Sequence, residues 1–244
     1  MNIAIIGYGN MGKEIEAVAR ERKIHVEKIF TEENNENGLG LTPDSLKGVD
    51  VCIEFTAPES VLDNIEAVVD AGKSIVVGTT GWYDKLPEVK KLVKQTKVGL
   101  LYSPNFSLGI NLFFQILTTA AHVFDRFDIY DVALSETHHR EKIDSPSGTA
   151  LALGNLIIQH FHCKREILHE TAHGRIKPDQ LHISSTRIGH VFGRHSVVFD
   201  SEADSIELVH TAKNRRGFAL GALIAAEWLK GKKGVFTMKD VLTS

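Results

Sequence analysis

The sequence predicts an α/β protein of two domains, and two observations carry that prediction. In the first half of the 244 residues, short apolar runs alternate with segments whose apolar residues recur every three or four positions, as parallel strands and crossover helices require. Beyond about residue 108, four strand-like runs follow one another with few helices between them. We therefore expect a doubly wound parallel sheet, and a second α+β domain built on a mostly antiparallel or mixed four-stranded sheet.

The first half alternates strand and helix from its first residues. Residues 3–6 form a continuous apolar run that ends at Gly7, which is typical of a strand buried on both faces. A helix is expected over 12–22, where apolar residues have helical spacing and charges lie on the other side. The further strands expected in this half are 26–30, 49–55, 74–77 and 98–102, and its further helices are 60–71 and 85–96.

The second half begins with a long apolar helix, expected over residues 110–124. Further helices are expected over 150–161 and 217–229. A tight turn around Gly189 is expected to join two strands into a hairpin, and the polar stretch 200–204 to join the last two. The four strands are expected at 128–135, 181–188, 190–199 and 205–212.

Composition and charge narrow the function classes. Charged residues make up 24% and hydrophobic residues 43% of the chain, which is ordinary for a globular enzyme. The formal net charge of -3 argues against a nucleic-acid or membrane-surface partner. The first residues do not resemble a signal peptide, no apolar run approaches the ~20 residues that span a bilayer, and Cys52 and Cys163 match no metal or redox spacing. We expect a cytoplasmic protein.

A glycine-rich turn between the first strand and the first helix predicts a cofactor. Its G-x-G-x-x-G spacing suits a Rossmann-type dinucleotide site: the first glycine permits the turn, the second admits the pyrophosphate and the third lets helix and strand pack. The pyrophosphate then lies at the positive end of the helix dipole. The alternative is a purely structural glycine turn. The cofactor-binding residues expected here are Gly7, Tyr8, Gly9, Asn10, Met11 and Gly12.

An acidic residue predicts which dinucleotide is preferred. Glu32 stands 20 positions beyond the last glycine of the turn, where it can accept hydrogen bonds from the ribose hydroxyls. Glu33 is also acidic, and no Lys or Arg occurs between Thr31 and Leu46, so a 2′-phosphate would meet carboxylates. We expect NADH to be preferred over NADPH, unless Lys13 or a distant cation reaches the phosphate.

Two further turns follow strands of the first half, at the sheet edge where such folds bind ligands. One contains Gly78, Thr79 and Thr80, which can contact the nicotinamide ribose; the alternative is a plain strand-to-helix turn. The other follows the last strand of this half, and its Phe106 is expected either near the nicotinamide or in the core. The cofactor-binding residues expected in this turn are Ser103, Pro104, Asn105 and Phe106.

Residues 136–149 carry the strongest functional signal. Two histidines, His138 and His139, stand beside the cations Arg140 and Lys142, and a turn of small residues follows. A histidine is a natural proton donor near neutral pH. The cations are expected to lower its pKa until an arriving dianion raises it again. Zinc is a less favoured alternative, because neighbours on a strand point to opposite faces, and no metal is expected.

The small-residue turn precedes an apolar helix and completes an anion site. Ser145 or Ser147 can cap that helix. The N–H groups of Gly148 and Thr149 are then expected to point at a bound anion. Ordinary N-capping is the alternative, and it is compatible with carboxylate binding. The segment thus offers a proton donor, positive charge and an anion cradle to a small anionic substrate.

With these motifs in place, the chain resembles the dihydrodipicolinate reductase family, whose members are 4-hydroxy-tetrahydrodipicolinate reductases. The segment His-His-Arg-x-Lys-x-Asp-x-Pro-Ser-Gly-Thr-Ala is far more specific to that family than the glycine turn is. The resemblance implies NAD(P)H-dependent reduction of 4-hydroxy-tetrahydrodipicolinate to tetrahydrodipicolinate, in lysine and diaminopimelate biosynthesis. The matching segments are residues 7–12, 78–81, 103–107, 138–150 and 218–228.

The resemblance also implies a role for each residue of the substrate site. His138 corresponds to the proton donor or acceptor, and Lys142 to a second catalytic residue that helps to protonate the substrate. Arg215 matches an arginine that supports the histidine pair. The residues expected to bind the carboxylates of the substrate are His139, Gly148 and Thr149.

The same resemblance implies a domain organisation and an assembly. Residues 1–108 and 216–244 are expected to form the dinucleotide-binding domain, and residues 109–215 the substrate-binding and oligomerisation domain of a homotetramer. Two departures from the family matter. Glu33 stands where an arginine is frequent, which favours NADH, and Pro104 replaces a frequent alanine.

Two rival functions fit the sequence less well. Another nicotinamide-dependent dehydrogenase, acting on a small amino-acid-like anion, would explain the glycine turn but not residues 138–149. A non-catalytic dinucleotide sensor would keep the glycine turn without needing a histidine, a lysine and an anion cradle on the nicotinamide side.

Overall fold

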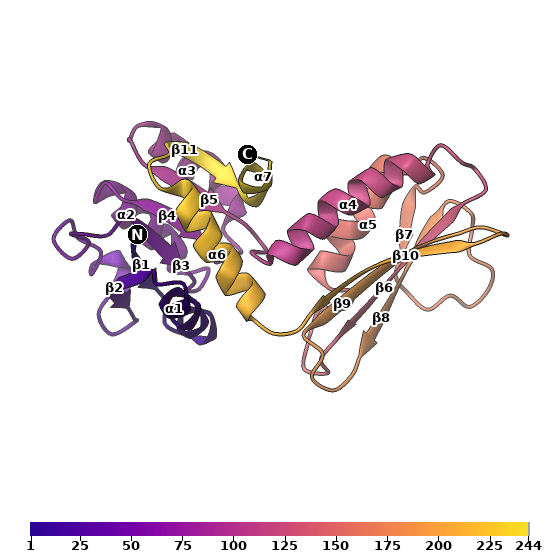
Figure 1. Cartoon of the computed structure of the whole chain (residues 1–244), viewed down its shortest axis with the longest axis horizontal. Helices are drawn as coiled ribbons and strands as arrows, with labels where there is room; N and C mark the ends of the chain where they lie inside the picture. The colour runs from indigo at the N-terminus through magenta and orange to yellow at the C-terminus, as the bar shows by residue number, and fades with distance from the viewer. Residues whose placement is uncertain (244) are drawn as a thin grey trace. The chain divides into compact units, whose positions relative to one another are not determined.

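The computed structural model describes residues 1–243, which form two compact units (Figure 1). Met1–Asn111 and the residues from Arg215 onward make the first unit, and Leu112–Asn214 make the second. The first unit therefore consists of two separate stretches of chain, with the second unit inserted between them. Among residues 1–243 there is no helix long and apolar enough to cross a lipid bilayer.

The first unit is built on a six-stranded sheet whose described strand pairs are all parallel. Its order is β11-β5-β4-β3-β1-β2, so the chain passes from β1 to β2 on one side and continues through β3 on the other. The carboxyl ends of β1 and β3 therefore meet at a switch point, where such sheets bind ligands. The strands are β1 (Asn2–Ile6), β2 (His25–Phe30), β3 (Val51–Glu54), β4 (Ser74–Val77), β5 (Gly99–Tyr102) and β11 (Gly234–Thr237).

Helices cover both faces of this sheet because its strands bury side chains on both sides. Along β1, Ile3 and Ile5 pack with α1 and α6, whereas Ala4 and Ile6 pack with α2 and α3. α6 comes from the far end of the chain yet packs against α1 (Figure 1). The helices are α1 (Asn10–Glu21), α2 (Val61–Asp70), α3 (Leu86–Lys94), α6 (Arg216–Leu229) and α7 (Met238–Leu242), with short 3-10 turns at Glu36–Gly38 and Tyr83–Lys85.

The second unit is built on a five-stranded mixed sheet in the order β10-β9-β6-β8-β7. β6 pairs antiparallel with β9 and parallel with β8. Burial alternates along β6, where Val132 and Leu134 are buried and Asp131 and Ala133 are exposed, so one side of the strand faces a core. α5 packs against β6 and β8. The elements are β6 (Asp131–His138), α5 (Gly148–His160), β7 (Glu166–Leu168), β8 (Gln180–Arg187), β9 (Gly193–Asp200) and β10 (Ser205–Ala212), together with α4 (Leu108–Phe124), which begins in the first unit and continues into the second.

The expected fold class is confirmed, with one strand more than expected in the second sheet. The additional strand, β7, has three residues and pairs with β8 at the sheet edge. Such a short run shows no periodic pattern in the sequence. β11 and α7, which have four and five residues, are likewise not among the elements expected from the sequence.

The expected hairpin around Gly189 is wrong, whereas the hairpin between β9 and β10 is confirmed. β6 lies between β8 and β9 and pairs with both of them. The chain after β8 passes the end of β6, where the Ile188 N–H donates to the His138 carbonyl oxygen (2.9 Å). The residues around Gly189 determine only that the chain turns there. Which strands pair depends on β6, which is distant in sequence and inserts between β8 and β9.

Gly221 lies where α6 passes the backbone at Phe106. A Cβ at this position would lie 1.7 Å from the Phe106 carbonyl oxygen, so the helix must move to accept one. We expect Gly221→Ala to lower the free energy of unfolding by about 1–3 kcal/mol, the usual cost of overpacking. Urea unfolding followed by circular dichroism measures the change.

Gly217, on the same helix, is the matched control. The nearest atom to its Cβ position is Ser107 Oγ, at 3.8 Å. Gly217→Ala should leave the free energy of unfolding unchanged or raise it by up to ~1 kcal/mol, because alanine favours a helix. Equal destabilisation by the two substitutions would contradict this packing.

Candidate active site

Close backbone contacts hold the glycine turn after β1. Gly7 has a positive φ of 91°, and a Cβ on it would lie 2.1 Å from the Phe55 carbonyl oxygen. A Cβ on Gly12 would lie 2.2 Å from the Gly7 carbonyl oxygen, so neither position accepts a side chain. A Cβ on Gly9 would meet nothing within 4 Å. The turn is therefore packed on its protein side and open at Gly9.

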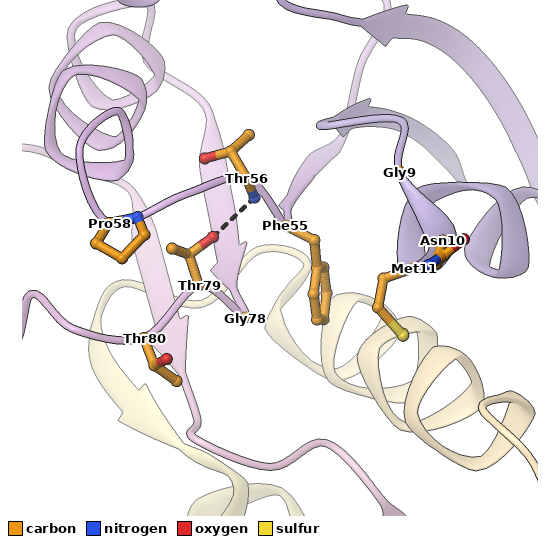
Figure 2. A pocket seen from close by; sticks show the side chains of 9 residues that line it. All are labelled: Gly9, Asn10, Met11, Phe55, Thr56, Pro58, Gly78, Thr79 and Thr80. Atoms are coloured by element: carbon orange, nitrogen blue, oxygen red, sulfur yellow. Dashed lines mark hydrogen bonds between the residues drawn. The ribbon is translucent and has the colours of Figure 1, made fainter. Parts of the chain in front are cut away.

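A cavity of about 390 Å³ opens at Gly9, over the carboxyl ends of β1, β3 and β4 (Figure 2). The N-terminus of α1 borders the cavity, and the first turn of that helix has no acidic residue. Backbone N–H groups at a helix N-terminus attract an anion. The cavity is lined by Gly9, Asn10, Met11, Phe55, Thr56, Pro58, Gly78, Thr79 and Thr80.

Hydrogen bonds tie together the two loops that follow β3 and β4. Thr79 Oγ1 accepts from the Thr56 N–H (2.8 Å, dashed in Figure 2) and donates to Glu54 Oε1 (3.1 Å). The Trp82 indole N–H donates to the Thr79 carbonyl oxygen (2.8 Å). Glu54 is fully buried at the end of β3, and burial raises the pKa of its carboxyl. The loops therefore reach the cavity in a fixed arrangement.

The structure brings some of the expected cofactor residues to the cavity and leaves others outside its lining. Tyr8 hydrogen-bonds Glu16 through its hydroxyl. Glu32 is exposed just after β2. The expected residues that line the cavity are Gly9, Asn10, Met11, Gly78, Thr79 and Thr80.

Three lining residues are not among those expected from the sequence, although they follow β3. The sequence predicts that strand, and parallel strands end at the same edge of a sheet. Phe55 is the last residue of the strand expected over 49–55, and Thr56 and Pro58 come just after it, so their position at its carboxyl end is a usable signal. These residues are Phe55, Thr56 and Pro58.

The turn after β5 folds back on itself beside this region. Ser103 Oγ donates to the Asn105 carbonyl oxygen (2.8 Å), and Pro104 is exposed. Phe106 is buried in the core of the first unit. Its ring centroid lies 5.8 Å from that of Phe55, which lines the cavity. Phe106 is thus a core residue that supports the cavity wall.

In the second unit, a charged cluster replaces the apolar core at the carboxyl end of β6. Glu136 and His138 lie on the buried face of β6, after its apolar residues. Because β8 runs parallel to β6, its last residue, Arg187, aligns with His138. On the antiparallel side, His195 of β9 aligns with Glu136. Three strands therefore contribute to one cluster.

Glu136 is the centre of this cluster. Its Oε2 is hydrogen-bonded to His138 Nδ1, and its Oε1 accepts from Arg187 Nη2 (2.8 Å) and from the Ser147 N–H (3.2 Å). Burial acts to raise the pKa of this carboxyl, but the hydrogen bonds from Arg187 and His138 outweigh it, so the pKa lies below its usual value. Glu136 is a buried carboxylate that keeps its charge.

The two histidines of the cluster are neutral near pH 7. Burial lowers the pKa of His138, against the opposing effect of Glu136. His195 contacts His138 edge-on, with ring centroids 5.2 Å apart, and burial lowers its pKa to about 4. Ser147 Oγ lies 3.2 Å from His195 Nε2 and caps α5 by accepting from the Ala150 N–H (3.1 Å). The cap of α5 is thereby joined to the histidines.

Lys142 and the N-terminus of α5 meet at Asp144. Lys142 Nζ lies 2.6 Å from Asp144 Oδ1, and the Gly148 N–H donates to Asp144 Oδ2 (3.3 Å). The ammonium holds the pKa of Asp144 below its usual value. The Gly148 N–H thus contacts a carboxylate of the chain itself, and the half-buried Thr149 follows it. One carboxylate is thus held by both Lys142 and the N-terminus of α5. A carboxylate ligand could be bound by the same two groups.

His139 and Arg215 are the other two residues expected to serve this site. The His139 carbonyl oxygen accepts from the Lys142 N–H (3.2 Å), just past the end of β6. Arg215 is the N-cap residue of α6 and belongs to the first unit, whereas the histidine pair belongs to the second. The cluster residues that are not among those expected from the sequence are Glu136, Arg187 and His195.

A glycine turn at the edge of a doubly wound sheet, together with a histidine–carboxylate cluster on a second unit, defines a nicotinamide-dependent oxidoreductase of two units. The chain belongs to the dihydrodipicolinate reductase family. The family region described as "Dihydrodipicolinate reductase, N-terminus" matches residues 1–106, and the region described as "Dihydrodipicolinate reductase, C-terminus" matches residues 109–242.

Curated relatives carry the name 4-hydroxy-tetrahydrodipicolinate reductase. That of Christiangramia forsetii is 38% identical over 244 residues, which are 100% of this chain and 98% of the relative. That of Chromobacterium violaceum is 39% identical over 207 residues, or 81% of this chain and 75% of the relative. That of Neisseria meningitidis is 36% identical over 199 residues, or 79% and 72%.

Solved structures share the fold. A dipicolinate-bound dihydrodipicolinate reductase from Paenisporosarcina sp. TG-14 has a TM-score of 0.79 at 22% identity and covers 98% of each chain. A probable dehydrogenase from Thermotoga maritima has a TM-score of 0.57 at 12% identity, over 100% of this chain and 93% of that one. Both likenesses concern the architecture.

Burial of His195 makes the stability of the protein depend on pH. Its pKa of about 4 lies below the ~6.5 of an unfolded histidine, so the unfolded chain takes up the proton first. The free energy of unfolding should therefore fall as the pH drops from ~6.5 to ~4, with a slope from this group of at most about 1.4 kcal/mol per pH unit. Urea unfolding across this range measures the slope.

Two variants separate this histidine from the other titrating groups. His195→Gln should make the decline in the free energy of unfolding shallower. His169→Gln removes an exposed histidine and should leave the slope as it is. A slope in His195→Gln equal to that of the unaltered protein would show that His195 is protonated equally in both states.

Proposed function

We propose that the protein catalyses the NAD(P)H-dependent reduction of 4-hydroxy-tetrahydrodipicolinate to tetrahydrodipicolinate, in lysine and diaminopimelate biosynthesis. The observation that carries the proposal is the cluster at the end of β6. There a neutral histidine is hydrogen-bonded to a buried carboxylate, next to a lysine and a helix N-terminus that hold a carboxylate. Membership of the family over the whole chain supports the same activity.

The first unit fits a dinucleotide. The open side of the turn at Gly9 leaves room for a pyrophosphate at the N-terminus of α1, where the N–H groups and the helix dipole favour negative charge. Thr79 and Thr80 would contact the nicotinamide ribose from the other side of the cavity. When bound, the nicotinamide supplies the hydride for the reduction.

The second unit supplies the proton and holds the substrate. The substrate is a dicarboxylate, and one of its carboxylates can replace that of Asp144 between Lys142 and the Gly148 N–H. His139 and Thr149 would hold the other. A bound dianion raises the pKa of His138, which then carries the proton it is to donate. The 4-hydroxyl group and one ring hydrogen leave as water, and one hydride and one proton are added to the ring.

We propose a cytoplasmic homotetramer from the family resemblance. Residues 1–108 and 216–244 would bind the dinucleotide, and residues 109–215 would bind the substrate and form the subunit contacts. β10 exposes two apolar side chains, which lie on opposite faces of the strand. They are Ile206 and Val209.

The loss of NADH absorbance, with 4-hydroxy-tetrahydrodipicolinate made in situ, tests the activity. The unaltered protein should turn over, and His138→Gln should lower kcat by about 10²–10⁴-fold, because the proton donor is lost. The Kd for NADH should not change in that variant, since the substitution lies in the second unit. His169→Gln, at an exposed position, is the control. NADH binding without turnover by the unaltered protein would favour a dinucleotide sensor instead.

We propose that NADH is preferred over NADPH because two exposed carboxylates, Glu32 and Glu33, follow β2. The ratio of kcat/KM for the two cofactors measures the preference. Glu33→Arg should raise kcat/KM for NADPH, since a cation then faces the 2′-phosphate. Glu36→Arg makes the same charge change at another exposed position after β2, and it should raise kcat/KM for NADPH less than Glu33→Arg does. An advantage of about tenfold for NADPH in the unaltered protein would contradict the proposal.

A further inference from the structure

Glu136 is a buried charge that the proposed reaction does not itself require. The carboxyl group has no exposed surface, at a position of β6 where the preceding inward residues are apolar. Removing a carboxylate from water costs several kcal/mol unless other charges and hydrogen bonds replace the water. Arg187, His138 and the Ser147 N–H provide that replacement. The fold thus maintains a charge in hydrogen-bond contact with His138.

We propose that Glu136 is a positioning residue that holds the Nδ1–H of His138 and so makes Nε2 the nitrogen that exchanges a proton with the substrate. This inference rests on the proposed role of His138. An ionised carboxylate only accepts hydrogen bonds, so the nitrogen beside it must carry hydrogen. The neutral imidazole is then held as one tautomer, with the lone pair on Nε2.

The neighbouring strand β9 approaches His138 closely at Nε2. A Cβ on Gly193, at the start of β9, would lie 2.9 Å from His138 Nε2. The His138 ring therefore requires glycine at position 193, because a side chain there would collide with Nε2. Nδ1 is thus occupied by Glu136, which leaves Nε2 as the ring nitrogen for proton exchange.

The partners of Glu136 also fix where His138 stands relative to the anion cradle. Arg187 Nη2 donates to Glu136 Oε1 (2.8 Å) and to the Asp144 carbonyl oxygen (2.7 Å). The Ser147 N–H, at the cap of α5, donates to the same carboxylate oxygen (3.2 Å). One carboxylate therefore joins β6, β8 and the start of α5. This arrangement sets the distance between the proton donor and the helix N-terminus.

The charges around His138 determine whether loss of the Glu136 charge raises or lowers the pKa of His138. Glu136 raises its pKa, whereas Lys142 and Arg187 lower it, so removing the Glu136 charge must lower it further. His195 is neutral near pH 7. The titratable and charged groups that face His138 are Glu136 on its own strand, Arg187 on β8, His195 on β9 with His210 beyond it on β10, and Lys142 and Asp144 in the loop that follows.

Glu136→Gln tests the proposal, because it keeps the shape of the side chain and removes the charge. The pKa of His138, followed by its ring NMR signals, should fall by at least ~1 unit. The pH above which kcat declines should fall with it, and kcat near neutral pH should drop at least ~10-fold. Glu136→Asp keeps the charge and should restore part of this loss. Glu207→Gln, on an exposed carboxylate of β10, should change neither quantity.

A double-mutant cycle separates positioning from general structural support. In the His138→Gln background, Glu136→Gln should change kcat less than ~2-fold, because its effect passes through His138. Additive losses would overturn the proposal. So would a folded Glu136→Gln protein in which the pKa of His138 and kcat are unchanged.

The nitrogen chemical shifts of His138 in the unaltered protein give a test that needs no variant. They should show that the hydrogen of the neutral ring is on Nδ1, and a hydrogen on Nε2 would overturn the proposal. This measurement decides the question even if Glu136→Gln does not fold. These shifts and the pKa of His138 are measured without turnover. If the unaltered protein does not reduce 4-hydroxy-tetrahydrodipicolinate, the proposed function fails while the contact between Glu136 and His138 is still tested.

Discussion

Parallel pairing between strands determines where chemistry can occur in both units. Two parallel strands end at the same edge of their sheet, so their last residues and the loops that follow are brought together. In the first unit, β1, β3 and β4 end side by side, and the cavity lies over their ends. In the second unit, β6 and β8 end with His138 aligned to Arg187. The same backbone constraint therefore builds a cavity in one unit and a charged cluster in the other.

Two buried glutamates show how their surroundings set the charge of a carboxyl group. Glu54 accepts hydrogen bonds from the Thr56 N–H and the Thr79 hydroxyl (both 3.1 Å), and burial raises its pKa. Glu136 is equally removed from water, but a guanidinium donates to it and its pKa is lowered. A cation in hydrogen-bond contact is the physical difference. Glu54 joins two loops, whereas Glu136 keeps its charge beside a histidine.

Most of the first unit follows from local patterns in the sequence. The continuous apolar runs predict the strands of its sheet, and the glycine spacing predicts a turn in which Gly7 and Gly12 accept no Cβ. The second unit is less predictable, because the partners of its strands are chosen over long sequence distances. β8 and β9 are close in sequence and look like a hairpin, yet β6 pairs with both of them. The turn at Gly189 carries no information about β6, which lies more than 50 residues earlier in the chain.

The sequence by itself determined the fold class, the glycine turn, the histidine–lysine segment and, through its resemblance, the family. These depend on short-range features: apolar periodicity, glycine spacing and a continuous run of residues. Only the tertiary structure decided that Glu136, Arg187 and His195 surround His138, since they come from three strands. It also decided the charge of each group. The pKa of a group depends on its burial and its hydrogen-bond partners, and both involve residues that are distant in the sequence.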